Sequence, residues 1–208
     1  MLSTFGWNLF VPHERVLVAS VPRCGSTYLL RSLANLPQGS NFPKRGSCRF
    51  VGSLSKLPDA AFLKTHAWAP CSLPDDVRTV FLFGDPIGSI VSTKLFRFTK
   101  DHFRNCGYVS TNVPDIYEHD DLGYEIIFDS WMRSHKFPVL ALRYEAMHQH
   151  ESTLSSFLGR QVRLLPWLCR ATNVSPDLRL RLTRVYGRFV EKVNASPDAE
   201  LISQCGAD

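Results

Sequence analysis

The sequence predicts an α/β fold with three α/β/α layers, in which helices cover both faces of a central parallel sheet. The clearest strand is Arg78–Phe83 (RTVFLF), where β-branched and aromatic residues run on without alternation. Such a run indicates a strand that is buried on both faces, as in a parallel sheet. Apolar runs at Arg15–Ser20 and Pro138–Arg143 are likewise followed by helical or polar segments. Strands that alternate with helices are typical of parallel sheets.

The remaining elements follow from local patterns along the chain. Further strands are expected at Cys48–Gly52 and Ala60–Lys64, the first of them within the Gly-, Ser- and Pro-rich stretch Pro37–Lys56. Helices are expected from Ser26 to about Asn35, from Pro86 to about Thr99, over Gly123–His135, over Ser152–Leu158 and over Pro176–Val193. Asp85 and Pro86 fit the N-cap and first position of the second helix. The polar, weakly periodic Lys100–Asp120 is expected to be flexible or lid-like.

Length and charge limit the classes of function. The 208 residues suit a single domain over 1–208, because a chain of this length can bury a substantial core. The net charge of +5 is spread among acidic residues. This pattern does not indicate a nucleic-acid-binding tail, although it is compatible with anionic ligands.

Six cysteines occur without a CxxC pair, so reduced thiols are expected rather than a disulfide framework or a zinc site. No stretch approaches the roughly 20 apolar residues of a membrane span. The N-terminus also lacks the pattern of a signal peptide. We therefore expect a cytoplasmic protein, with a luminal domain lacking its anchor as the alternative.

The stretch Val16–Leu30 (VLVASVPRCGSTYLL) predicts an anion site, because an apolar strand leads through a tight loop into a helix. Unpaired N–H groups at a helix N-terminus stabilise a phosphate or sulfate. Gly25 allows close approach of the backbone, and Arg23 adds a positive charge. Ser26 and Thr27 add hydroxyl groups that could also cap the helix.

A P-loop kinase or nucleotide hydrolase is one class that uses such a loop. It requires Lys between the last Gly and the hydroxyl residue, but here Ser26 follows Gly25 directly. Asp85, after a buried strand, does resemble a magnesium-binding carboxylate. A dinucleotide-binding fold is disfavoured because no GxGxxG motif is present.

Four motifs together resemble the sulfotransferases that use 3′-phosphoadenosine 5′-phosphosulfate (PAPS), of which this chain would be a short and divergent member. The motifs lie in the family's order and span about two thirds of the chain. They are Pro22–Thr27 (PRCGST) for the phosphosulfate loop, Leu63–His66 (LKTH), Phe83–Ser92 (FGDPIGSIVS) for the 3′-phosphate element, and Trp131 with Val139–Glu145 (VLALRYE).

The resemblance implies a role for each of these residues. Arg23 and Lys64 would neutralise the charge that grows on the bridging oxygen during sulfuryl transfer, and His66 would act as the general base. A carboxylate base, which some members use, cannot be placed in this sequence. The expected donor ligands are Arg23, Cys24, Gly25, Ser26, Thr27, Tyr28, Ser92 and Tyr144, with the two tyrosines near the adenine. PAPS would be the co-substrate, and no metal is required.

The sequence departs from the family pattern where the 3′-phosphate element usually carries Arg, because Gly84 stands there. A bidentate Arg–phosphate contact is not easily replaced by Ser92 alone. Lys94, Arg97, Arg181, Arg184 and Arg188 are possible substitutes. The segment that closes over the nucleotide in cytosolic members is also missing. A degenerate scaffold that binds a nucleotide without catalysis is therefore a second alternative.

The acceptor is expected to be a small molecule or a carbohydrate, and the sequence does not identify it. Candidate acceptor residues lie in the loops at Gly39–Leu57 and Lys100–Asp121. They are Phe42, Arg49, Phe50, Phe103, Arg104 and Tyr108. The sequence leaves the oligomeric state open.

Overall fold

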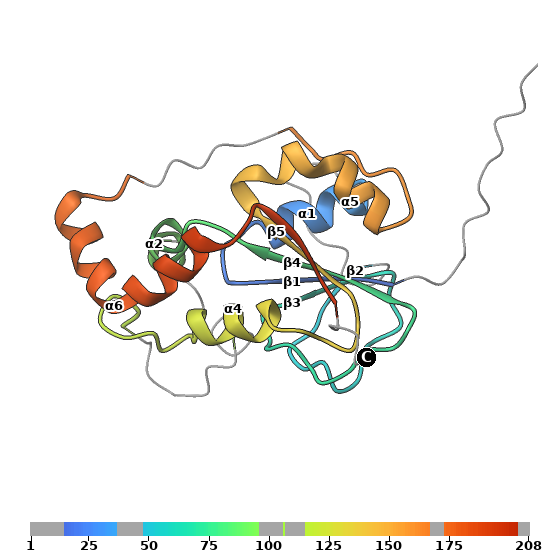
Figure 1. Cartoon of the computed structure of the whole chain (residues 1–208), viewed down its shortest axis with the longest axis horizontal. Helices are drawn as coiled ribbons and strands as arrows, with labels where there is room; N and C mark the ends of the chain where they lie inside the picture. Colours follow the sequence, from blue (N-terminus) through green and yellow to red (C-terminus); the bar gives the residue numbers. More distant parts are fainter. Residues whose placement is uncertain (1–14, 37–47, 96–105, 107–114, 167–172, 204–208) are drawn as a thin grey trace, which may run out of the picture.

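The computed structural model describes residues 15–36, 48–95, 106, 115–166 and 173–203. Their strands form one sheet in the order β2-β3-β1-β4-β5-β6 (Figure 1). The strands are β1 Arg15–Ser20, β2 Cys48–Phe50, β3 Phe62–Thr65, β4 Val77–Phe83, β5 Val139–Arg143 and β6 Ala199–Ile202. The helices are α1 Ser26–Leu33, α2 Pro86–Leu95, α4 Tyr124–Met132, α5 Glu151–Phe157 and α6 Pro176–Ala195, with a 3₁₀ helix at Tyr144–His150.

The first five strands are parallel, as the sequence predicts, whereas β6 pairs antiparallel with β5. The sheet is therefore mixed, and the expectation of a wholly parallel sheet is corrected at one edge. The sequence did not predict β6, because it has only four residues and two of them, Glu200 and Leu201, are exposed. A short edge strand with this composition carries no clear pattern of burial.

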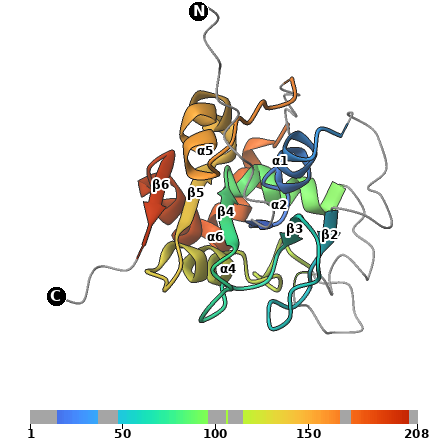
Figure 2. The same ribbon diagram turned by 90° about the vertical axis from the view of Figure 1, so that its right-hand side faces the viewer.

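Both faces of the sheet are covered by helices (Figures 1 and 2). One core lies between the sheet and α2, α4 and α6, and the other lies between the sheet and α1 and α5. Strand β1 contributes alternately to the two cores, with Leu17 on one face and Val16 and Val18 on the other. Burial on both faces explains the continuous apolar runs in the sequence. Trp131, which belongs to the fourth motif, is fully buried in the first core.

The structure shows how three helices begin. The side chain of Asp85 accepts hydrogen bonds from the backbone N–H groups of Ile87 and Gly88, which confirms the predicted cap of α2. Helix α1 differs from the expectation, because its N-cap is Gly25 and no side chain caps it. Ser26 and Thr27 instead lie within the first turn. Helix α6 is capped by Ser175, whose side chain accepts from the Leu178 N–H.

The predicted end of α2 after Leu95, with Arg97, lies outside the described residues. Most of Lys100–Asp120, the segment expected to be lid-like, lies outside them as well. The last part of that segment, Asp115–Asp120, is described and forms turns held against α6. Within the described ranges, no helix has both the length and the apolarity needed to cross a membrane.

Candidate anion-binding and catalytic site

The loop after β1 lies at the topological switch point of the sheet, where successive strands are added on opposite sides of β1. Strands β3 and β4 flank β1, and the helices that follow β1 and β4 lie on opposite faces of the sheet. Ligands of open α/β sheets bind at this kind of position, outside the carboxyl ends of the strands. The sheet order therefore brings the loop at Arg23–Thr27, the end of β3 and the start of α2 together.

The loop has an unusual backbone. Both Arg23 (φ 67°) and Gly25 (φ 77°) adopt left-handed conformations, which a non-glycine residue seldom does. The ring of Tyr144, which follows β5, packs so closely against Gly25 that a Cβ there would overlap two ring carbons. Gly25 is thus required both for its φ and for contact with Tyr144.

Lys64 on β3 points toward the first turn of α1. Its Nζ donates a 2.8 Å hydrogen bond to Thr27 Oγ1. Burial, with a smaller contribution from the nearby charge of Arg23, lowers the pKa of Lys64 to about 8. An anion bound at the N-terminus of α1 would raise the pKa of Lys64 again, because a nearby negative charge favours the charged ammonium.

His66 follows β3 and is 7% exposed. Its Nδ1 lies 2.9 Å from the carbonyl oxygen of Ser20 and 3.1 Å from the Ser20 hydroxyl. A carbonyl only accepts, so Nδ1 carries the hydrogen and Nε2 of the neutral ring holds the lone pair. This hydrogen bond fixes the orientation and the tautomer that a general base needs.

Arg23 and Cys24 both contact α2. Arg23 Nε donates to Ser92 Oγ at 3.0 Å, so the structure joins two residues that the resemblance assigns to opposite ends of the donor. Cys24 Sγ lies 3.2 Å from Ser89 Oγ. Burial raises the pKa of the Cys24 thiol to about 12. The start of a helix would by itself lower the pKa of a thiol, but desolvation prevails here.

Tyr28 and Tyr144, the residues expected near an adenine, lie together beside the loop. Their rings meet edge to face with centroids 6.4 Å apart. The Tyr28 hydroxyl lies 2.8 Å from His148 Nε2 and donates to the carbonyl oxygen of Leu165. These contacts hold the Tyr28 ring at the edge of the site.

At the end of β4, the Glu145 carboxylate lies against Gly84. It accepts a 2.9 Å hydrogen bond from the Asp85 N–H. Although Glu145 ends the motif Val139–Glu145, the sequence indicated no role for it. Its position depends on the pairing of β4 with β5, which sets Phe83 opposite Arg143. The register of a parallel pair cannot be read from either strand alone.

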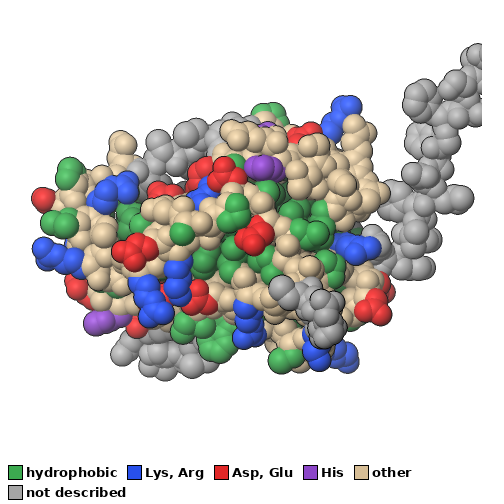
Figure 3. Space-filling view, viewed as in Figure 1, with side chains coloured by type: hydrophobic (Ala, Val, Ile, Leu, Met, Phe, Trp, Pro, Cys, Tyr) green, Lys and Arg blue, Asp and Glu red, His purple; other side chains and the backbone are tan. Residues whose placement is uncertain are grey.

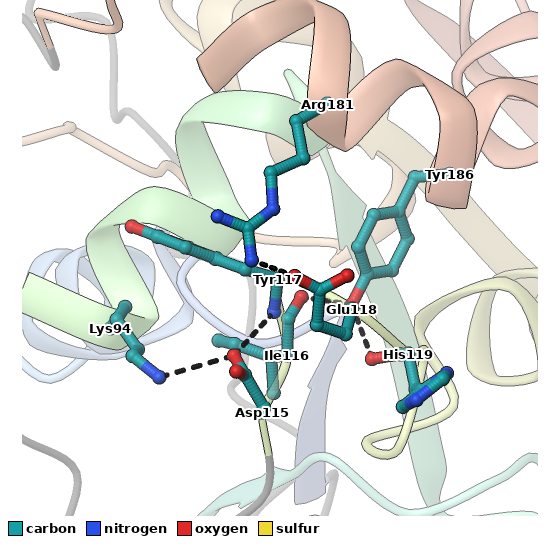
Figure 4. Close-up of polar contacts among 8 residues, drawn as sticks. All are labelled: Lys94, Asp115, Ile116, Tyr117, Glu118, His119, Arg181 and Tyr186. Carbon is teal, nitrogen blue, oxygen red and sulfur yellow. Dashed lines mark hydrogen bonds and ion pairs between the residues drawn. The ribbon is translucent and has the colours of Figure 1, made fainter.

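Most of the possible substitutes for the missing Arg are engaged elsewhere. Lys94 pairs with Asp115 at 3.3 Å, and Arg181 pairs with Glu118 (Figure 4). Arg188 pairs with Glu125 at 3.0 Å, and Arg184 is exposed on α6. Figure 3 shows Lys and Arg side chains interspersed with Asp and Glu on one face of the molecule.

The structure groups the expected donor ligands around one loop, together with Lys64 and His66. These ligands are Arg23, Cys24, Gly25, Ser26, Thr27, Tyr28, Ser92 and Tyr144. Among the described residues, no group of three or more His, Cys, Asp or Glu side chains could hold a metal ion.

The sequence matches no known protein family and no curated protein. Among solved structures, the chain is similar to mouse sulfotransferase SULT7A1 complexed with PAP. The two share 14% identity with a TM-score of 0.43, over 94% of this chain and 72% of the mouse chain. This level of similarity does not establish a common function, which must instead be inferred from the residues of the site.

Proposed function

We propose that the chain is a sulfotransferase that takes a sulfuryl group from a nucleotide 5′-phosphosulfate. PAPS is the donor that the resemblance implies. The observation that carries the proposal is the convergence of a half-buried ammonium and an oriented imidazole beside one loop. Lys64 contacts Thr27 in the first turn of α1, and His66 is held by Ser20 at the end of β1.

In the proposed reaction, the bond between sulfur and the bridging phosphate oxygen breaks as sulfur bonds to the acceptor oxygen or nitrogen. The acceptor proton passes to Nε2 of His66. The negative charge that remains on the phosphate is neutralised by Lys64, Arg23 and the N–H groups of α1. The Phe50 ring, whose centroid lies 6.0 Å from that of His66, suits an acceptor with a phenol or sugar ring.

A P-loop kinase or hydrolase is less well supported, because its metal ligand would be Asp85. Both carboxylate oxygens of Asp85 accept backbone hydrogen bonds at the start of α2. Only a measurement of sulfuryl transfer distinguishes an enzyme from a scaffold that binds a nucleotide without catalysis.

The experiment measures transfer of labelled sulfate from a nucleotide 5′-phosphosulfate to 4-nitrophenol and to a methyl pyranoside. Loss of a general base typically costs 10²–10⁴-fold in rate. We therefore expect His66→Ala to lower transfer at least about a hundredfold while donor binding is retained. His119→Ala, which alters an exposed histidine, is the matched control and should leave transfer unchanged.

The proposal is wrong if the protein prefers ATP with magnesium to a phosphosulfate. Transfer that survives in His66→Ala would remove the base from the mechanism. Donor binding without transfer to either acceptor would favour the scaffold.

A further inference from the structure

The carboxylate of Glu145 occupies the end of the site at which the resemblance expects a cation. A Cβ at Gly84 would lie 2.8 and 2.9 Å from its two oxygens. The Asp85 N–H, at 2.9 Å, holds this carboxylate in place. The Glu145 carboxylate therefore fills the space that the first atom of a side chain at position 84 would need.

The charge of Glu145 is less compensated than that of its neighbour. Both side chains are exposed, but Asp85 accepts from two N–H groups at the positive end of α2, whereas Glu145 accepts from one N–H. In the part of the chain that the structure describes, neither carboxylate forms an ion pair with Lys or Arg. This end of the site is therefore negative, whereas the end at Lys64 and Arg23 is positive.

A nucleotide in the proposed site would pass close to Glu145. Its 5′-phosphate would lie at the N-terminus of α1, and its base would lie against Tyr28 and Tyr144. Tyr144 packs on Gly25, and Glu145 is the next residue in the chain. The ribose, which joins the phosphate to the base, would therefore present its hydroxyl groups near Gly84 and Glu145.

We propose that Glu145 determines donor specificity, and that the site selects a nucleoside 5′-phosphosulfate with a free 3′-hydroxyl over its 3′-phosphorylated counterpart. This inference rests on the proposed function. A carboxylate accepts hydrogen bonds from ribose hydroxyls, as the acidic residue of dinucleotide-binding folds does. The same carboxylate repels a phosphate dianion, so one residue both attracts one ligand and rejects the other.

Calorimetric titration with adenosine 5′-monophosphate and adenosine 3′,5′-bisphosphate tests the inference. We expect the wild-type protein to bind the monophosphate about tenfold or more tightly than the bisphosphate, a difference of about 1.4 kcal/mol. Glu145→Gln keeps an acceptor for the Asp85 N–H but removes the charge. Binding of the bisphosphate should therefore tighten enough to remove most of the tenfold preference for the monophosphate. Glu200→Gln, on the exposed edge strand β6, is the matched control and should preserve the preference.

A second variant covers the case in which Glu145→Gln does not fold. Gly84→Arg would bring a guanidinium beside the carboxylate, whose flexible side chain can move aside. We expect this variant to reverse the preference in favour of the bisphosphate. The inference is overturned if the wild-type protein prefers the bisphosphate, or if the folded variants leave the ratio unchanged. If the wild-type protein binds neither nucleotide, the proposed function fails as well.

Discussion

Gly25 combines two constraints that a single substitution can test. An alanine there would have to adopt a left-handed φ, and its Cβ would also overlap the Tyr144 ring. The left-handed conformation alone costs roughly 1–2 kcal/mol for a non-glycine residue. We expect Gly25→Ala to lower the free energy of unfolding by about 3 kcal/mol, because overpacking adds a further 1–3 kcal/mol.

Urea unfolding provides the measurement, and Gly159→Ala provides the control. Gly159 has a φ of 62°, but a Cβ there would meet nothing within 4 Å. The difference between the two variants isolates the contact with Tyr144. Equal costs would show that Tyr144 moves away from the loop.

Lys64 is expected to reduce stability while serving the site. Its pKa falls from the ordinary 10.5 to about 8, mainly through burial. Because the unfolded chain binds this proton more tightly, the free energy of unfolding should rise as pH increases from about 8 to 10.5. A shift of this size corresponds to on the order of 3 kcal/mol.

Lys64→Met removes the charge while keeping a long side chain. We expect it to raise the free energy of unfolding at pH 7 by about 1–3 kcal/mol and to abolish anion binding. Its advantage over the wild-type protein should shrink between pH 8 and 10.5. Lys56→Met, at an exposed position, should show neither effect. A difference in the free energy of unfolding that stays constant from pH 8 to 10.5 would contradict the lowered pKa of Lys64.

At the scale of the elements, Arg143 joins β5 to the end of α6 and to the start of β6. Its Nη2 donates to the carbonyl oxygens of Val193 (2.6 Å) and Ser196 (2.8 Å). Its Nε pairs with Asp198 at 2.7 Å. The last carbonyls of a helix have no partners within the helix, so this guanidinium serves as a tertiary cap.

Arg143→Met should lower the free energy of unfolding by about 2 kcal/mol. It removes the side-chain donor of the Ser196 carbonyl oxygen and leaves the Val193 carbonyl oxygen with only the Ser196 N–H. Hydrogen exchange in β6 should also accelerate. Arg15→Met is the control, because Arg15 is similarly buried and its guanidinium pairs with the Asp76 carboxylate rather than with helix-end carbonyls. It should cost about 1 kcal/mol or less. Unchanged exchange in β6 would show that β6 is held by β5 alone.

The segment before α4 shows how a polar stretch can be held without a strong sequence pattern. The Tyr186 hydroxyl shares its one hydrogen between the carbonyl oxygens of Ile116 (2.7 Å) and His119 (3.1 Å) (Figure 4). These partners lie 70 and 67 positions away along the chain, so local sequence cannot indicate the contact. The ion pair of Lys94 with Asp115 could not be predicted from local sequence either. The sequence indicated only that Lys94 is a possible phosphate ligand and that Asp115 lies in a loop.

At the scale of the whole molecule, the sheet order determines what meets at the site. Loop Arg23–Thr27 follows β1, His66 follows β3, Asp85 follows β4 and Tyr144 follows β5. Because these four strands are parallel neighbours, the segments after them meet at one edge. We propose that residues 1–208 form a single domain, since β1 and β4 contribute to both cores.

The sequence by itself determined the α/β class, the five parallel strands, the cap of α2 and the loop between β1 and α1. Each of these depends on local pattern: apolar runs, Asp85 before Pro86, and Gly25 between a strand and a helix. The residues expected around that loop were implied by the resemblance of four motifs, and the roles of His66, Lys64 and Arg23 in catalysis remain predictions from it.

Only the tertiary structure decided the charge at the far end of the site and the state of Lys64. Glu145 reaches Gly84 because β4 and β5 pair in a particular register. Burial around Lys64 lowers its pKa, and burial around Cys24 raises the pKa of the thiol. Register and desolvation arise from residues distant in the chain, and for that physical reason no local pattern could have indicated them.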